Sequence, residues 1–169
     1  MNGHEHLRVE KVKCYVITVS DSRTAETDES GKLIVDAFGR AGHGIRGYSV
    51  VPDETDVIRA RLKEALEDPE VDVILLNGGT GISPRDVTPE AVRPLLEREL
   101  PGFGEAFRRL SFAEIGPRAL LSRAIAGVAN GKLIFVLPGS PRGVALALEE
   151  LVLPLLGHAV FELRRKGAR

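Results

Sequence analysis

The chain has 169 residues, of which 43% are hydrophobic and 28% charged, with a formal net charge of −1. This length predicts one domain with a well-buried core, since folding at this size removes roughly 70% of the surface that an unfolded chain exposes. A balanced charge without a long basic run argues against a nucleic-acid partner and favours a small, discrete ligand.

The first predicted strand is the apolar segment KVKCYVITVS, residues 11–20. It contains Cys14, the one cysteine of the sequence, which excludes an internal disulfide framework and a multi-cysteine metal site and fits a reducing cytoplasm. No signal-peptide pattern precedes this strand. We expect residues 1–10 to form a flexible tail. His4 and His6 could in principle chelate a metal, but two histidines in a polar N-terminal tail are more often simply disordered.

Helix-like and strand-like segments then alternate. Residues 31–42 have helical spacing and end in Gly42, a residue typical of helix C-termini. Residues 45–51 predict a second strand and residues 54–68 a second helix. Residues 71–77, VDVILLN, predict the clearest strand of the chain. This alternation indicates a sheet built from βα units.

Two further helices are expected, from about Pro89 to Arg98 and from about Gly104 to Phe112. An apolar stripe formed by Phe103, Phe107 and Leu110 accompanies the second of them. Such a stripe usually faces the core, although a subunit contact or a ligand would also use it.

The last third of the chain predicts a hairpin and a long helix. Residues 123–139 contain two apolar runs joined at Asn130-Gly131, the pair that best tolerates positive φ in a tight turn. The final helix covers residues 141–163 and is expected to be interrupted or bent near Pro154. Acidic residues and this proline break its apolar stretches, so we predict no membrane span.

This order of elements predicts an α/β fold: a three-layer α/β/α sandwich around a mostly parallel, mixed sheet with one antiparallel strand, in a single domain over residues 1–169. Ligands bind such sheets outside the carboxyl ends of the strands. Four polar or glycine-rich clusters follow predicted strands: SDS (20–22), PDE (52–54), NGGTG (77–81) and PGSP (138–141). We expect several of them to converge on one rim.

The NGGTG cluster has three glycines in four positions, which lets the backbone present successive N–H groups to an anion. A tight turn is the alternative, but it requires fewer glycines. In the PGSP cluster, Ser140 is a natural helix N-cap with Pro141 at the first helical position. Capping alone explains both residues, and an anion at the same helix end is equally compatible.

Two aspartates and a threonine lie in or next to these clusters. Asp53 and Thr88 are each placed to cap a following helix. Asp86 lies in a loop without an evident capping role. An ion pair with Arg85 is its simplest alternative, but adjacent loop side chains usually point apart and exposed pairs stabilise by only ~0–1 kcal/mol.

Two motifs match known patterns in the wrong context. The segment GHGIRG, residues 42–47, has the dinucleotide-binding pattern but leaves a helix and enters a strand. The segment GSPRG resembles a hydrolase nucleophile elbow with Ser140 displaced by one position, and His158 is the only histidine downstream. A Ser140 hydrolase is therefore a minor alternative.

Together, the segments ITVSDSRT (17–24), NGGTGISPRDVTPEA (77–91), FGEAFRRLSFAEIG (103–116) and SRAIAGVANGKLIFVLPGSP (122–141) resemble the MoaB/MogA family of molybdenum cofactor biosynthesis proteins, most closely its MoaB branch. The resemblance extends from about Val12 to the final helix. It implies a cytoplasmic homotrimer or homohexamer that binds molybdopterin, a pterin with a dithiolene and a terminal phosphate. Active family members adenylylate that phosphate with Mg-ATP and release pyrophosphate. A non-catalytic molybdopterin carrier, or an assembly partner of other enzymes of the pathway, is the alternative.

The resemblance also implies roles for individual residues. The two essential aspartates of the family fall on Asp53 and Asp86, which are expected to be catalytic and to hold Mg²⁺ directly or through water. The expected substrate- and phosphate-binding residues are Ser20, Asp21, Gly78, Gly79, Thr80, Gly81, Arg85, Thr88, Gly139 and Ser140. The chemistry independently favours such a set, because two polyanions that meet beside aspartates repel unless a hard divalent cation neutralises them.

Overall fold

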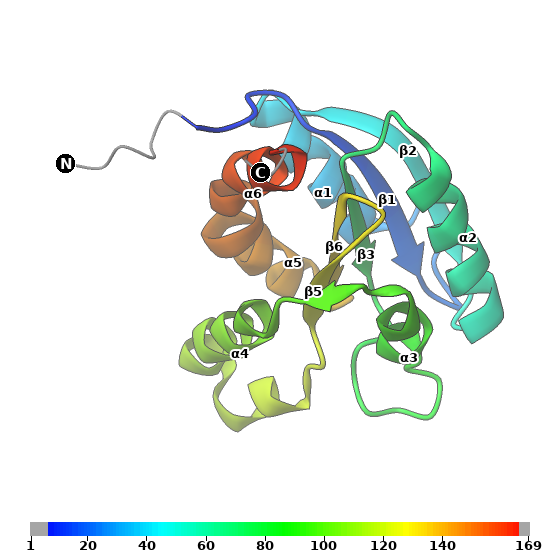
Figure 1. The fold of residues 1–169 in the computed structure, drawn as a ribbon. Coiled ribbons are helices and arrows are strands. Elements are labelled where there is room, and N and C mark those ends of the chain that lie inside the picture. The colour runs from blue at the N-terminus through cyan, green and yellow to red at the C-terminus, as the bar shows by residue number, and fades with distance from the viewer. Residues whose placement is uncertain (1–6, 166–169) are drawn as a thin grey trace.

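The computed structural model describes residues 7–165 as one mixed sheet with helices on both faces (Figure 1). The strands are β1 (Lys13–Val19), β2 (Gly44–Val51), β3 (Val73–Asn77), β4 (Arg98–Glu99), β5 (Ile125–Ala129) and β6 (Lys132–Leu137). The α-helices are α1 (Glu29–Arg40), α2 (Thr55–Glu67), α3 (Thr88–Val92), α4 (Pro101–Ile115), α5 (Pro141–Ala147) and α6 (Leu153–Arg164). The predicted α/β fold class is confirmed.

The sheet has the strand order β2-β1-β3-β6-β5-β4. Strands β2, β1, β3 and β6 are parallel, whereas β5 is antiparallel to both of its neighbours. The predicted hairpin of β5 and β6 is thus the source of the one reversed strand. Its turn residues Asn130 and Gly131 have φ values of 47° and 69°, the left-handed conformation that the Asn-Gly pair predicts.

The central strands are buried on both faces, because helices cover both sides of the sheet. On β3, Val73 and Leu75 pack into the core beneath α1, α4, α5 and α6, whereas Ile74 and Leu76 pack into the core beneath α2 and α3. This alternation explains why β3 is a continuous apolar run and not a half-polar strand. Phe103 and Phe107 of the α4 stripe belong to the first core, and Leu110 is half-buried.

The predicted helix from Pro89 to Arg98 is wrong in its second half. Helix α3 ends at Val92, a 3₁₀ turn follows at Arg93–Leu95, and Arg98–Glu99 forms β4 at the edge of the sheet. Pro94 explains the break, because its ring clashes with the carbonyl of residue 90 and it lacks the N–H of a helix interior. Helix α4 also begins earlier than predicted, with Pro101 at its first position.

The final helix is interrupted near Pro154 as predicted, by a π-helical segment at Leu148–Val152 that ends two residues before the proline. By length and composition alone, residues 141–164 would suffice to cross a membrane. However, one face of this segment is buried in the domain core, with Leu148 and Leu156 fully inaccessible. The segment thus packs against the domain core through one face.

At the N-terminal end, residues 1–6 of the expected tail, with His4 and His6, lie outside the described residues. Farther along, the Val9 N–H donates a hydrogen bond of 3.0 Å to the Gly157 carbonyl of α6. Cys14 is fully buried in β1, and this burial raises the pKa of its thiol. The thiol is therefore protonated and inert at neutral pH.

Candidate functional site

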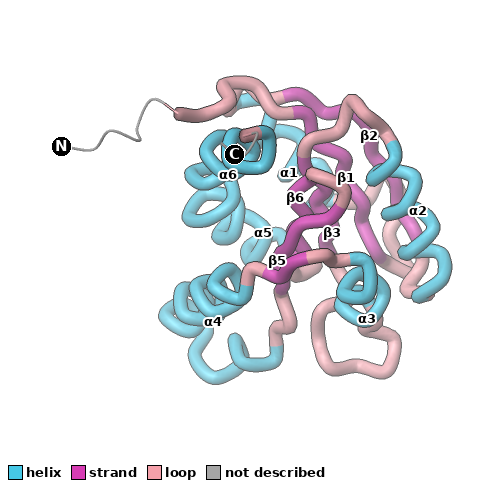
Figure 2. The backbone as a smooth tube through the Cα atoms, in the orientation of Figure 1, coloured by secondary structure: helices cyan, strands magenta, loops and turns pink. Residues whose placement is uncertain are grey.

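The four clusters that follow the parallel strands converge on one rim, as predicted. The Ser20 N–H donates to Val51 O at the end of β2 (2.9 Å), and the Gly78 N–H donates to Leu137 O at the end of β6 (3.1 Å). A methyl group added to Gly139 would lie 3.3 Å from the Gly78 Cα. Figure 2 shows the longest of the rim segments, the loop between β3 and α3.

The glycines of this loop are required by its conformation. Gly78 and Gly79 have φ values of 98° and 66°, which side chains with a Cβ rarely adopt. A Cβ on Gly78 would overlap the Val19 carbonyl oxygen, and a Cβ on Gly79 would overlap the Thr88 hydroxyl. The backbone therefore turns sharply in a place without room for side chains.

The carbonyl groups of residues 78–81 are all engaged by two residues. Thr88 donates to Gly78 O through its hydroxyl (2.8 Å) and to Gly79 O through its N–H (3.1 Å). Arg123 donates to Thr80 O through its N–H and to the carbonyl of residue 81 through Nε, both at 2.9 Å.

In a trans peptide unit the N–H points opposite to the C=O, so the N–H groups of residues 79–82 point away from Thr88 and Arg123. None of these four N–H groups donates a hydrogen bond to another residue of the range 7–165. The loop has the form of an anion-binding nest.

Thr88 does not cap α3, in contrast to the prediction. It is the first helical residue, Val87 occupies the N-cap position, and the Thr88 side chain is fully buried against the Gly78 carbonyl. Its hydroxyl is inaccessible to a ligand, so Thr88 shapes the loop from behind.

The two aspartates flank the nest. A Cβ added to Gly81 would lie 2.7 Å from Asp86 Oδ2, and a Cβ added to Gly79 would lie 3.0 Å from Asp53 Oδ1. Asp86 Oδ2 also accepts the Ser83 N–H within the loop (2.9 Å). Asp53 does not cap α2, contrary to expectation, because that helix begins at Thr55 after a residue that makes no side-chain cap. Both carboxylates face the glycine loop.

Arg85 pairs with Asp21 and not with its neighbour Asp86. Its Nε and Nη2 donate to the two Asp21 oxygens, both at 2.9 Å, and this bidentate pair lowers the pKa of Asp21. Asp21 Oδ1 also accepts the Asp53 N–H at 3.0 Å. The pair thus joins the ends of β1 and β2 to the β3–α3 loop across the mouth of the site.

Negative charge accumulates at Asp53. Partial burial raises its pKa above the ordinary 3.8, and the neighbouring charges of Asp21 and Asp86 raise it further. Within the part of the chain that the structure describes, no group of three or more His, Cys, Asp or Glu side chains could hold a metal ion. Mg²⁺ is usually bound through one or two carboxylates together with substrate phosphates, so Asp53 and Asp86 fit an ion that arrives with a phosphate ligand.

This crowding predicts that Asp53→Asn stabilises the free protein at pH 7. A carboxyl group whose pKa is raised by folding contributes stability below the unfolded pKa of 3.8 and loses it as the pH rises through the folded pKa. Urea denaturation should give Asp53→Asn a higher free energy of unfolding than the parent at pH 7, with the difference shrinking towards pH 3. The same change at the exposed Asp36 of α1 is the control, and equal effects at both positions would contradict the prediction.

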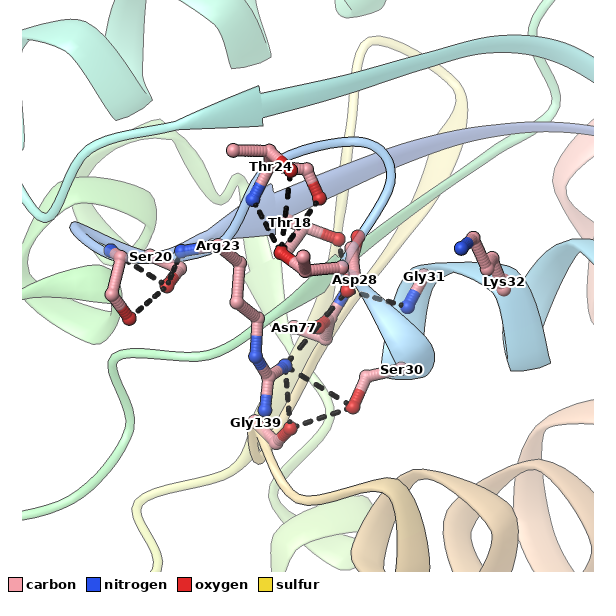
Figure 3. A network of polar contacts seen from close by, with 12 residues as sticks. Thr18, Ser20, Arg23, Thr24, Asp28, Ser30, Gly31, Lys32, Asn77 and Gly139 are labelled. Carbon is pink, nitrogen blue, oxygen red and sulfur yellow. Dashed lines mark hydrogen bonds and ion pairs between the residues drawn. The ribbon is translucent and has the colours of Figure 1, made fainter.

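The PGSP loop is held from the opposite side by a buried polar network (Figure 3). The Gly139 carbonyl accepts from Ser30 Oγ (2.7 Å) and from Arg23 Nη1 (2.9 Å), and Arg23 also lies 3.8 Å from the fully buried Asp28. Ser140 caps α5 as predicted, accepting the Gly143 N–H at 3.1 Å.

Sequence reasoning missed Arg23 and Arg123, the arginines that bind carbonyl groups of the two rim loops. Arg23 lies 116 positions from Gly139, and Arg123 lies 42 positions from Gly81. The sequence shows Arg23 next to the SDS cluster and Arg123 two residues before β5, and both arginines lie in segments that carry the family resemblance. Neither place reveals that a guanidinium binds a distant backbone carbonyl.

The fold and its rim define an open, mostly parallel α/β protein of the class that binds ligands at the carboxyl ends of its strands. Residues 15–158 match the family described as "Probable molybdopterin binding domain". The chain belongs to this family of molybdenum cofactor biosynthesis proteins, which confirms the resemblance found in the sequence.

Several relatives are similar over nearly their whole length. The molybdenum cofactor biosynthesis protein B of Bacillus subtilis (strain 168) is 49% identical over 163 residues, 96% of each chain. That of Halalkalibacterium halodurans is 52% identical over 153 residues, 90% of each chain.

Solved structures agree. A crystal structure of a molybdenum cofactor biosynthesis protein B, 48% identical, superposes with a TM-score of 0.90 over 92% of this chain and 98% of that one. The tungsten cofactor synthesizing protein MoaB from Pyrococcus furiosus, 35% identical, superposes with a TM-score of 0.83 over 93% and 99%. The chain therefore has a role in molybdenum cofactor biosynthesis.

Proposed function

We propose that this chain is a molybdopterin adenylyltransferase: it binds molybdopterin and transfers AMP from Mg-ATP to the terminal phosphate of the pterin. One observation carries the proposal. An anion-binding nest lies between two carboxylates, Asp53 and Asp86, and its four N–H groups donate to no other residue of the described range 7–165. A simple phosphate-binding site would not place carboxylates there, because they repel the ligand unless a cation accompanies it.

In the proposed reaction, an oxygen of the molybdopterin phosphate attacks the α-phosphorus of ATP. The new P–O bond forms as the bond to the oxygen that bridges the α- and β-phosphates breaks, and pyrophosphate leaves with the electron pair. Mg²⁺, when bound, supplies positive charge to the phosphate oxygens. The protein supplies placement and electrostatic stabilisation.

Different residues of the rim have different roles in this reaction. The N–H groups of the 79–82 loop bind phosphate oxygens, and Asp53 and Asp86 hold the cation directly or through water. Ser20, Gly139 and Ser140 contribute polar groups of the neighbouring loops. Arg85 exchanges Asp21 for a phosphate when the ligands enter: its side chain is more than half exposed at the mouth of the site, and a guanidinium can donate to a phosphate as it does to a carboxylate.

Pyrophosphate release tests the proposal. Incubation of the protein with Mg-ATP and molybdopterin should yield one pyrophosphate for each molybdopterin consumed, and none when either substrate or Mg²⁺ is omitted. If the protein bound molybdopterin but released no pyrophosphate, it would instead be a non-catalytic carrier of the same pathway.

The proposal includes a cytoplasmic homotrimer or homohexamer, with other enzymes of the pathway as further partners. An apolar groove between α4 and α6 supports the assembly. It is lined by Leu100, Pro101, Gly102, Phe103, Ala106, Phe135, Glu150, Leu151, Pro154, Leu155, His158 and Ala159. Contiguous exposed apolar surface of this kind is typical of protein interfaces.

We expect Leu155→Glu to dissociate the proposed oligomer. Leu155 is 40% exposed in the single chain, and a charge there would be buried unpaired against the neighbouring copy. Analytical ultracentrifugation should give the 18.3 kDa mass of one chain for the variant and a multiple of it for the parent. Val57→Glu, at a similarly exposed site on α2, should keep the parent mass. A Leu155→Glu variant with the parent mass would place the interface elsewhere.

A further inference from the structure

Arg123 occupies an unusual place behind the proposed site. It lies between the 3₁₀ turn at Gly116–Leu121 and the start of β5, yet its side chain crosses to the β3–α3 loop. There it donates from Nε to Gly81 O (2.9 Å) and from Nη2 to Asp86 O (2.8 Å). Its own N–H binds Thr80 O. One residue therefore fixes three carbonyl groups of one loop.

The remaining guanidinium nitrogen, Nη1, points to α3 and forms an ion pair with Glu90. Although partial burial opposes the shift, this hydrogen bond lowers the pKa of Glu90. Glu90 thus remains ionised and holds the guanidinium in the plane that reaches both carbonyls. Lysine could not replace Arg123, because an ammonium group lacks the rigid, planar guanidinium that donates in several fixed directions.

These contacts determine which groups the loop presents to a ligand. Because Thr80 O and Gly81 O are bound to Arg123, the N–H groups of residues 81 and 82 point the other way, into the rim. Because Asp86 O is bound as well, the Asp86 backbone is fixed 2.8 Å from the same guanidinium. The nest and the Asp86 carboxylate therefore share one anchor.

We propose that Arg123 is a positioning residue for the site: it holds the loop so that its amides and the Asp86 carboxylate face the phosphates and their cation together. This inference rests on the proposed adenylyl transfer for its catalytic consequence. Its structural consequence, a loop held for a Mg²⁺–polyphosphate ligand, can be measured without turnover.

The experiment compares Arg123→Ala, Arg123→Lys and the control Arg46→Ala, which removes an ion pair between Arg46 of β2 and Asp68 at the end of α2. Amide hydrogen exchange reports the loop, because the amides of Ser83, Asp86 and Thr88 are protected by hydrogen bonds within it. We expect both Arg123 variants to exchange these amides faster by on the order of tenfold or more, with exchange in the core strands unchanged. Arg46→Ala should match the parent.

Calorimetric titration with inorganic pyrophosphate and Mg²⁺ should then show about tenfold weaker binding for both Arg123 variants. In the pyrophosphate-release assay, kcat should fall by roughly 10²-fold, and more Mg²⁺ should be needed for half-maximal rate, as expected for a misplaced metal-holding carboxylate. A mere loss of packing would leave the Mg²⁺ requirement unchanged.

The outcomes separate the two proposals. If the parent protein releases no pyrophosphate, the proposed enzymatic function fails, while hydrogen exchange and Mg²⁺–pyrophosphate titration still decide the role of Arg123. If the loop amides and the titration of Arg123→Lys equal those of the parent, the inference is overturned. If exchange is faster but binding and the Mg²⁺ requirement are unchanged, the loop position is irrelevant to the ligand and the inference is overturned as well. Should Arg123→Ala not fold, Arg123→Lys carries the test.

Discussion

Asp86→Asn is expected to lower the rate of pyrophosphate release by on the order of 10³-fold while molybdopterin binding stays within about threefold of the parent. The substitution removes the charge that we propose to hold Mg²⁺ beside the phosphates. The loop itself should survive, because the amide oxygen of asparagine can accept the Ser83 N–H as Asp86 Oδ2 does. A loss of turnover without a loss of loop structure would isolate the electrostatic role of the carboxylate.

The measurement pairs a turnover assay with a molybdopterin titration on the same preparation. Asp36→Asn, which removes an exposed carboxylate from α1, should behave as the parent in both. Near-parent turnover of Asp86→Asn would remove Asp86 from the catalytic machinery. If molybdopterin binding fell together with turnover, Asp86 would already contribute to substrate binding before the reaction. The proposal that Asp86 acts in catalysis and not in molybdopterin binding would then be wrong.

Gly78→Ala is expected to lower the free energy of unfolding by roughly 3 kcal/mol or more, the sum of left-handed strain and a backbone collision. Its φ of 98° disfavours any Cβ, and the added methyl group would overlap the Val19 carbonyl oxygen of β1. Neither group can rotate away, since Val19 and Gly78 are backbone at the carboxyl ends of the neighbouring strands β1 and β3. The loop must therefore move, and the pyrophosphate-release rate should fall with it.

Gly42→Ala is the matched control for this prediction. Gly42 has a similar φ of 82°, but a Cβ there would meet nothing within 4 Å. It should therefore show the strain alone, about 1–2 kcal/mol, with turnover unchanged. Urea denaturation of both variants separates the two contributions, and equal losses at the two positions would refute the collision at Gly78.

Much of the fold could be predicted because its signals are local. The apolar run of β3, the Asn130-Gly131 turn and the interruption near Pro154 each follow from short-range chemistry. The 3₁₀ turn and β4 could not be placed, because a strand of two residues has no periodicity to detect. That strand exists only through its pairing with Val128 and Gly127 of β5.

The rim was predictable for a different reason. Parallel strands bring their carboxyl ends to one edge, so four clusters far apart in the sequence had to meet. The partner of Arg85 was not predictable, because Asp21 lies 64 positions away and only the folded rim brings the two together. Asp53 and Thr88 were misassigned as caps for a similar reason: their position beside a helix start is visible in the sequence, whereas the glycine loop that each one faces is not.

The two-residue turn between β5 and β6 has a consequence at the far end of the sheet. It sets the register of β6 against β5, in which Lys132 lies opposite Ala129 and Phe135 opposite Ala126, and β6 then ends at Leu137, shortly before Gly139. One residue inserted at Asn130-Gly131 and absorbed as a register slip would exchange the two faces of β6 and carry Gly139 about 3.3 Å along the strand axis. The length of a turn at the opposite end of the strands thus determines whether Gly139 approaches Gly78 closely at the rim of the proposed site.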